Sequence, residues 1–412
     1  MAIAVLQYQD VLSRLRASRW GVLISVALGV FVDYLIYGAI VPLTPYSPAG
    51  GQSGSTVSIL YGAYSVGVLL TTRVFGRFGD RAGYRSVMWF AVVLQVPAVL
   101  LLWHSDGLIL TLIGRLLQGA AAAATWTAGF ALLAARYPTE RVRMIGLALM
   151  ASTGGSVIGP VMSGALYQVG GYGLPFVILC VFVLIDAAVR FLLLSKDPPC
   201  EGPAFGAIRL ITDRSVAMPA LAVAIAAGAW GILEPTLPRH LEATLGASAA
   251  EVGLLFTLST TVYGLASPLV SLVTGRHGMT RTAITGTIMM AVTLPLLGVA
   301  PTVFLSAAVL CCVNVGFAFL LNPTSAELGD AVERRGLSCY GAVYAIYNIA
   351  YAVGMMSASN LAALLSDRFS FFEILLSVSI ILLLCVPVML GAGKAHAAGR
   401  RDAVKRFREN LS

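Results

Sequence analysis

The sequence predicts an all-α membrane protein with about twelve transmembrane helices, arranged as two pseudo-symmetric bundles of six. Hydrophobic residues make up 58% of the 412 residues and charged residues only 11%, whereas soluble domains carry about 25% charged residues. Apolar runs long enough to cross a bilayer recur from Trp20 to Gly391. The runs are continuous rather than alternating, which favours helices over a closed barrel. This composition indicates a membrane protein and not a soluble enzyme.

Breaks between the apolar runs divide the chain into twelve predicted spans. In the first half these cover residues 20–45, 57–77, 86–104, 108–135, 143–168 and 172–195. In the second half they cover residues 216–243, 250–274, 281–300, 303–329, 338–365 and 370–392. The predicted organisation is an N-terminal bundle over 1–195, a proline-rich cytoplasmic linker over 196–215, a C-terminal bundle over 216–392 and a basic cytoplasmic tail over 393–412. A short surface helix is expected within the linker, near 207–211.

The net charge of +8 is best explained by how the chain is oriented in the membrane. If the N-terminus is cytoplasmic, 22 of the 27 lysines and arginines lie in tails, linker or loops on the cytoplasmic side. This asymmetry is the positive-inside rule, and it predicts that both termini are cytoplasmic. The basic residues are expected to contact anionic lipid of the bilayer, and no nucleic-acid partner is predicted.

Cysteine and histidine patterns predict no cofactor. The six cysteines show no CxxC pairing and are expected to be small buried hydrophobic side chains without a disulfide framework. The four histidines are scattered singly, so no metal site is predicted.

The two halves resemble each other locally. The first span ends with Pro42 and Pro45, and the seventh with Pro235 and Pro238, at the same spacing. The loop from residue 79 to 85 also echoes that from 274 to 280. Paired interrupted helices in corresponding positions are typical of transporters with a site between two repeats.

Three motifs occur in order along the first half. Gly76, Asp80, Arg81, Gly83 and Arg85 form a GxxxDRxGxR pattern after the second span. Arg115 and Gln118 belong to an RxxQG pattern in the fourth span, and a GxxxGP…G pattern in the fifth span comprises Gly155, Gly159, Pro160 and Gly164. Together the motifs resemble the major facilitator superfamily over nearly the whole chain, and the last is similar to its proton-coupled antiporter branch.

Finer matches are similar to the vesicular amine transporters. Asp33 in the first span, the segment 233–235 in the seventh and the segment 340–346 in the eleventh carry this resemblance. The chain departs from that subfamily at three positions, because Tyr64 stands where the subfamily has a lysine, and Asn322 and Asn348 stand where it has acids.

Asp33 and Glu234 are the predicted coupling residues. Asp33 falls near mid-membrane, where a carboxylate is costly and is by default functional. Glu234 lies nearer the outside and is expected to gate, bind a cation or carry the proton. A carboxylate that ionises when water reaches it, and takes up a proton when the site is closed to water, can exchange that proton for a cationic substrate. The alternatives are a structural ion pair for Asp33 and an interfacial glutamate for Glu234.

Aromatic residues recur on one face of the eleventh span. Tyr340, Tyr344, Tyr347 and Tyr351 follow a spacing of i, i+4, i+7 and i+11. Beside Asn348 they are expected to line a cavity and stack on substrate or cradle an ammonium; plain packing is the alternative. Weaker candidates of the same kind share an aromatic ring and a place in a predicted span: Tyr34, Tyr37, Tyr61, Tyr64, Trp126 and Trp230.

The motif residues are expected to serve conformational change. The resemblance implies that Asp80 faces the start of the eleventh span, where a helix N-terminus favours an anion, and that Arg81 and Arg85 clamp an inner gate. It also implies a coupling role for Arg115, with a structural hydrogen-bonding role as the alternative. The glycines of the fifth span are expected to permit close packing, and Pro160 to bend that helix. Asp186 and Arg190, at i and i+4, are expected to pair.

The predicted function is proton-coupled export of a small organic cationic or amphipathic compound by alternating access. The expected partners are that substrate, protons and the bilayer, and the expected oligomeric state is a monomer. The expected location is the inner or plasma membrane of a cell. A symporter or facilitator of the same fold is the nearest alternative, and a channel is a more distant one.

Overall fold

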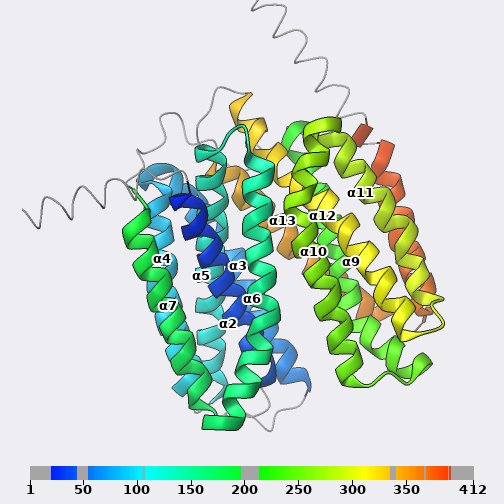
Figure 1. Cartoon of the computed structure of the whole chain (residues 1–412), viewed down its shortest axis with the longest axis horizontal. Coiled ribbons are helices and arrows are strands. Elements are labelled where there is room, and N and C mark those ends of the chain that lie inside the picture. The colour runs from blue at the N-terminus through cyan, green and yellow to red at the C-terminus, as the bar shows by residue number, and fades with distance from the viewer. Residues whose placement is uncertain are drawn as a thin grey trace, which may run out of the picture. The chain divides into compact units, whose positions relative to one another are not determined.

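The structure is a computed structural model that describes residues 20–43, 54–104, 107–195, 213–334, 340–365, 368–387 and 389–390. Within these ranges the chain consists of helices joined by short turns. In the first half the helices are α2 (Gly21–Leu43), α3 (Gly54–Ala82), α4 (Tyr84–His104), α5 (Leu108–Arg136), α6 (Arg141–Gly170) and α7 (Gly173–Leu193). Figure 1 draws these six helices side by side, from blue to green.

In the second half a further run of helices follows. They are α9 (Arg214–Leu245), α10 (Ala249–His277), α11 (Met279–Thr293), the short 3-10 helix η2 (Leu294–Gly298), α12 (Val303–Glu333), α13 (Gly341–Leu365) and a last helix at Phe371–Pro387. Each predicted span therefore coincides with a described helix, and the predicted fold class is confirmed. Nine of the described helices are long and apolar enough to cross a membrane by length and composition.

The chain divides into two compact units. The first unit comprises Met1–Ala207 together with Val332–Ala352, and the second comprises Ile208–Ala331 together with Val353–Ser412. The end of α12 and the first half of α13 thus belong to the first unit. The boundaries predicted at 195, 215 and 392 stay a prediction. Most of the predicted linker, its surface helix near 207–211, and the basic tail lie outside the described residues.

In the first unit, α2 packs along α6, and α5 packs against α3 and α4. A buried apolar cluster fills the space between α2, α4 and α7, with Leu35, Val99 and Leu179 among its members. The outward faces carry large apolar side chains, such as Leu70 at 69% exposure and Ile109 at 73%. Exposed apolar surface on many helices is expected where lipid, and not water, is the solvent.

Two tight turns join helix pairs at corresponding places in the halves. Gly83 between α3 and α4 has φ 87°, and Gly278 between α10 and α11 has φ 85°. This region is favourable for glycine because it has no Cβ. The amide of Gly83 donates to the Gly79 carbonyl at 2.9 Å, and that of Gly278 donates to the Thr274 carbonyl at 2.8 Å. The repeat inferred from the two loop sequences therefore extends to their backbone geometry.

Candidate functional site

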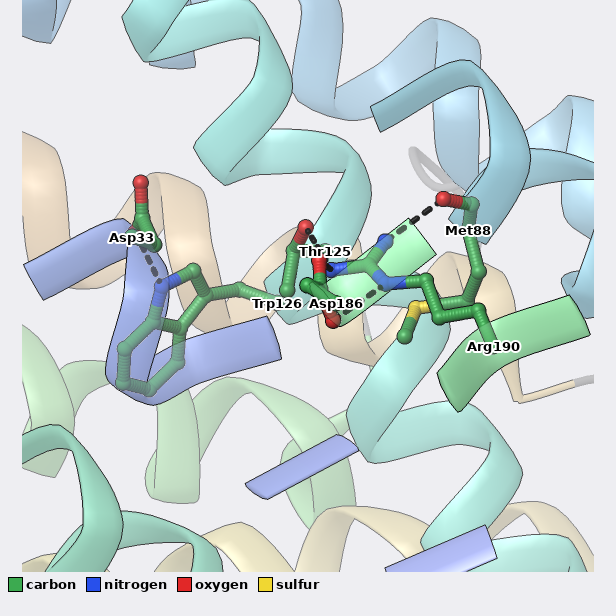
Figure 2. Close-up of polar contacts among 6 residues, drawn as sticks. All are labelled: Asp33, Met88, Thr125, Trp126, Asp186 and Arg190. Carbon is green, nitrogen blue, oxygen red and sulfur yellow. Dashed lines mark hydrogen bonds and ion pairs between the residues drawn. The ribbon is translucent and has the colours of Figure 1, made fainter. Parts of the chain in front are cut away.

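Asp33 lies within α2 and is buried inside the first unit. Its side chain is 3% exposed, and Oδ2 accepts a hydrogen bond from the indole Nε1–H of Trp126 on α5 at 2.9 Å (Figure 2). Oδ1 is buried and has no hydrogen-bond partner among the residues that the structure describes. One oxygen held by an indole and one left open is an arrangement suited to a proton or a cationic ligand.

Aromatic rings gather beside Asp33. Tyr34 meets Trp126 edge-on with ring centroids 5.5 Å apart, and Tyr37 lies 4.9 Å from the Tyr64 ring of α3. Tyr34 and Tyr37 are themselves 6.2 Å apart. Residues that the sequence marked only as weak candidates are therefore brought together by α2, α3 and α5. Faces of such rings attract organic cations.

Arg115 of α5 is buried at 1% exposure next to this group. Its Cζ lies 5.3 Å from the centre of the Tyr37 ring and 5.5 Å from that of Tyr64. Nη1 donates to Oε1 of Gln118 at 2.7 Å, and Nε donates to the Leu60 carbonyl at 3.3 Å. Ring contacts and hydrogen bonds explain how the first unit tolerates a buried arginine. Arg115 and Gln118 of the RxxQG motif therefore contact each other directly.

The tyrosine face of α13 packs on α5 within the first unit. Tyr344 and Tyr347 both contact Phe130, with ring centroids 5.8 and 5.7 Å apart, and Nδ2 of Asn348 donates to Oγ1 of Thr127 at 2.9 Å. Tyr344 is fully buried, whereas Tyr351 is half-buried. The packing interpretation thus describes what Tyr344 does here, and Tyr351 keeps the cavity-lining role as a prediction.

Asp80 and Tyr84 hold the start of α13. Oδ1 of Asp80 accepts from the amide of Gly341 at 2.9 Å and from the hydroxyl of Tyr84 at 2.7 Å. The Tyr84 hydroxyl in turn accepts from the amides of Tyr340 at 2.7 Å and Gly341 at 3.0 Å. A Cβ on Gly76 would lie 2.8 Å from the Gly341 carbonyl oxygen, so glycine permits this close approach. The position predicted for Asp80 is the one observed, and we call this group the α13 latch.

Sequence reasoning missed two parts of this region. Tyr84 occupies a variable position of the motif, so the motif itself did not indicate its role. The one available signal was its hydroxyl, four residues after Asp80 and therefore within hydrogen-bonding reach of that carboxylate. Arg141 of α6 forms an ion pair with Glu333 at 2.6 Å, and Tyr340 donates to the same carboxylate at 2.8 Å. Arg81 is exposed and Arg85 is half-buried, and their clamp role stays a prediction.

The motif in α6 is a packing surface against α2. A Cβ on Gly159 would lie 2.5 Å from the Leu35 carbonyl oxygen, and one on Gly155 would collide with the Phe31 carbonyl. Pro160 is part of α6 and lies close to Gly38 of α2, where an added Cβ would be 2.9 Å from the Pro160 ring. Gly164 differs, because a Cβ there would meet no atom of the described residues within 4 Å. The geometry at Gly155 and Gly159 therefore fits the close-packing role, and for Gly164 that role stays a prediction.

The second unit contains its own polar and aromatic group. Asn322 of α12 is fully buried, and its Nδ2 donates to the Ser267 carbonyl at 2.8 Å. Oδ1 of Asn322 has no hydrogen-bond partner in the described part of the chain. The Trp230 ring lies 6.0 Å from that of Phe317, and Glu234, one turn further along α9, has an exposed side chain.

The described cysteines, Cys180, Cys311, Cys312 and Cys385, are free thiols. Within the described ranges no group of three or more His, Cys, Asp or Glu side chains could hold a metal ion. Asp186 and Arg190 form the predicted pair, at 2.7 Å.

These features define a polytopic helical membrane protein with a buried carboxylate in its first unit. The family model described as Major Facilitator Superfamily matches residues 26–212 and 220–410. The chain therefore belongs to the Major Facilitator Superfamily. The predicted family is confirmed, and so is the expectation of a transporter class and not an enzyme, at the level of the family.

Curated relatives carry transporter names. The chain is 25% identical over 340 residues to the chromaffin granule amine transporter of Rattus norvegicus, covering 81% of this chain and 64% of that one. It is 24% identical over 385 residues to the probable vesicular acetylcholine transporter-B of Danio rerio, covering 89% and 78%. The synaptic vesicular amine transporter of Homo sapiens is 24% identical, covering 81% and 65%. The chain thus spans just under two thirds of the rat and human relatives.

Solved structures with this fold include the human organic anion transporter MFSD10 (TETRAN), with a TM-score of 0.79 at 16% identity, covering 90% of this chain and 99% of that one. A bacterial homologue of the iron transporter ferroportin in the outward-facing state gives a TM-score of 0.73 at 16% identity, with the same two coverages. At this identity the likeness shows the fold.

Proposed function

We propose that the chain is a secondary active transporter that exports a small organic cationic or amphipathic compound in exchange for protons. The observation that carries the proposal is the buried carboxylate of Asp33, in which Oδ2 accepts from Trp126 and Oδ1 has no hydrogen-bond partner in the described part of the chain. A bound cation and a proton would compete for the same oxygen. When access to that oxygen alternates between the two sides of the membrane, such competition couples the two fluxes.

The surroundings of Asp33 favour an organic cation. The rings of Tyr34, Tyr37 and Tyr64 lie beside it, and aromatic faces attract ammonium groups that are partly desolvated. The names of the rat and human relatives mention amines, which agrees with this chemistry. Glu234 of the second unit is the second candidate for carrying the proton, and Asn322 and Asn348, as amides, cannot take it over.

The α13 latch serves the conformational cycle in this proposal. It ties the first half of α13 to α3 and α4 through Asp80 and Tyr84, while the rest of α13 belongs to the second unit. Making and breaking these bonds would bias the equilibrium between conformations without touching Asp33.

We further propose that the transporter works as a monomer in an inner or plasma membrane, with both termini cytoplasmic. The cationic asymmetry of the loops supports this orientation. Labelling of single cysteines placed in either tail checks it, because modification from outside would contradict the assignment.

The decisive experiment is substrate-induced proton flux in proteoliposomes over a panel of organic cations. Asp33→Asn should abolish accumulation driven by a pH gradient, since the amide keeps size and hydrogen bonding but cannot exchange a proton. Glu234→Gln decides whether one acid or two are coupled. Glu373→Gln is the matched control, because Glu373 is exposed in the N-terminal turn of its helix, where glutamine also caps.

Four outcomes discriminate the alternatives. Retained accumulation in Asp33→Asn with loss in Glu234→Gln would leave Asp33 a structural or orienting role. Retention in both variants would favour a facilitator, and substrate and proton moving in the same direction would favour a symporter. Flux far above transporter turnover would indicate a channel.

A further inference from the structure

Asp186 and Arg190 form a bidentate ion pair inside the first unit. Nη2 of Arg190 lies 2.7 Å from Oδ2 of Asp186, and Nε donates to Oδ1 at 2.9 Å. Both residues are on α7, and their side chains are 5% and 2% exposed. A buried pair of this kind contributes little net stability, because the cost of desolvating two charges offsets their attraction. Its presence therefore calls for a role other than holding the bundle together.

Arg190 reaches well beyond its partner. Nη1 donates to the Met88 carbonyl of α4 at 2.5 Å, and Nη2 makes a longer contact of 3.4 Å with Oγ1 of Thr125 on α5. A Cβ on Gly29 of α2 would collide with the guanidinium and would lie 3.3 Å from the Thr125 methyl group. One guanidinium thus contacts α2, α4, α5 and α7 at a single level of the first unit.

Two of these helices, α2 and α5, also carry the hydrogen bond between Asp33 and Trp126. Gly29 lies one turn before Asp33 on α2, and Thr125 directly precedes Trp126 on α5. Figure 2 shows Arg190 drawn toward Thr125 on one side of α5 and the Trp126 indole reaching Asp33 on the other. The contacts of Arg190 at Gly29 and Thr125 therefore lie within one helical turn of both residues of the Trp126–Asp33 hydrogen bond.

We propose that the Asp186–Arg190 pair is a positioning element that keeps the Trp126 indole on Oδ2 of Asp33 and leaves Oδ1 for the proton or the ligand. The inference rests on the proposed function for the meaning of Asp33, but its geometric content does not. A guanidinium suits this role because its rigid fork can serve a carboxylate, a carbonyl and a hydroxyl at once.

Fluorescence of Trp126 tests the proposal without any transport measurement. In purified full-length protein that keeps Trp126 and carries phenylalanine at 20, 89, 103 and 230, emission should change with pH in one step. Asp33→Asn should remove that step. Arg115, Asp186, Arg190 and Tyr64 are charged or titratable groups near Asp33, so Arg115 and Tyr64 stay unchanged throughout.

The double variant Asp186→Leu/Arg190→Leu removes the pair with no net change in charge. It should stay folded, with a melting temperature within about 5 °C of the parent. Its pH step should move by at least about one unit, which is about tenfold in proton affinity. Arg190→Lys keeps the charge but not the fork, and its step should also move, by less.

An unchanged step in the folded double variant would overturn the proposal. A shift in the double variant with none in Arg190→Lys would also overturn it, because charge and not geometry would then be responsible. Glu333→Gln, which removes the partner of Arg141 in a different part of the first unit, should leave the step in place. If proton-coupled transport is never seen but the step responds to Arg190, the positioning role holds and the proposed function fails.

Discussion

The turn between α3 and α4 and the turn between α10 and α11 share a backbone but not a chemistry. Gly83 and Gly278 have nearly equal φ values, and each donates to the carbonyl four residues earlier. In the first turn Asp80 is buried and Tyr84 contacts it. Their counterparts in the second turn are Gly275, which is exposed, and Met279, and neither side chain can bind a helix N-terminus.

The comparison teaches that a repeated backbone turn need not repeat its function. Glycine at the positive-φ position is sufficient to turn the chain in both halves. Binding α13 requires a carboxylate and a hydroxyl as well, since the amides at the start of a helix need acceptors. We therefore expect changes in the first turn to affect transport, and matched changes in the second turn to affect stability alone.

Asp80→Asn should have the largest effect. Replacing a charged acceptor with a neutral one weakens its bonds to Gly341 and Tyr84 by about 1–2 kcal/mol, which corresponds to about a 5- to 30-fold slower transport cycle. Substrate affinity should stay within a few-fold, because the binding residues are untouched. Transport rates in proteoliposomes and equilibrium binding measure the two quantities.

The matched control is Gly275→Asp, which places a carboxylate at the equivalent position of the second turn. A Cβ there meets no atom of the described residues within 4 Å, so transport should change by less than about twofold. Loss of substrate binding in Asp80→Asn would contradict the assignment of Asp80 to the latch.

Tyr84→Phe should have an intermediate effect. It removes a hydroxyl that accepts from the Tyr340 and Gly341 amides, but Asp80 still accepts from Gly341. We expect transport to slow about three- to tenfold, in line with about 1 kcal/mol for one net hydrogen bond. Met279→Leu in the second turn is the control. Equal rates in Tyr84→Phe and the parent would show that Asp80 alone holds α13.

The smallest expected effect is the difference in stability between Gly83→Ala and Gly278→Ala. A side chain at positive φ costs about 1–2 kcal/mol in either turn, so both variants should melt a few degrees below the parent. Thermal unfolding in detergent measures this shift. Only Gly83→Ala should also slow transport, because it displaces Asp80 and Tyr84. A similar loss of transport in Gly278→Ala would break the distinction between the turns.

Local sequence predicted the helices and one of the latch residues. Apolar runs of bilayer length fix where spans begin and end, because the lipid core imposes that length on any helix crossing it. The i, i+4 spacing of Asp186 and Arg190 was enough to predict their pairing, since residues at that separation are neighbours on a helix. The motif around Asp80 predicted its position at α13 through resemblance to relatives.

Contacts between distant helices were beyond the reach of the sequence. Trp126 lies 93 positions after Asp33, and Glu333 lies 192 after Arg141, so no periodicity connects either pair. The role of Tyr344 shows the same limit, because its spacing is compatible with lining a cavity or with packing. Its contact with the ring of Phe130 favours packing, and the sequence does not contain that contact.

The sequence by itself determined that this chain is a helical membrane protein with two related halves and a carboxylate in its first span. Those properties depend on composition, on the length of the apolar runs and on single residues, because the bilayer core requires long apolar helices whatever their tertiary contacts. Only the tertiary structure decided that one oxygen of Asp33 accepts from Trp126 and that the other is buried without a hydrogen-bond partner among the described residues. It also decided that Arg190 contacts both helices that carry this bond. The physical reason is that hydrogen bonds depend on a few tenths of an ångström, and helix packing sets distances on that scale.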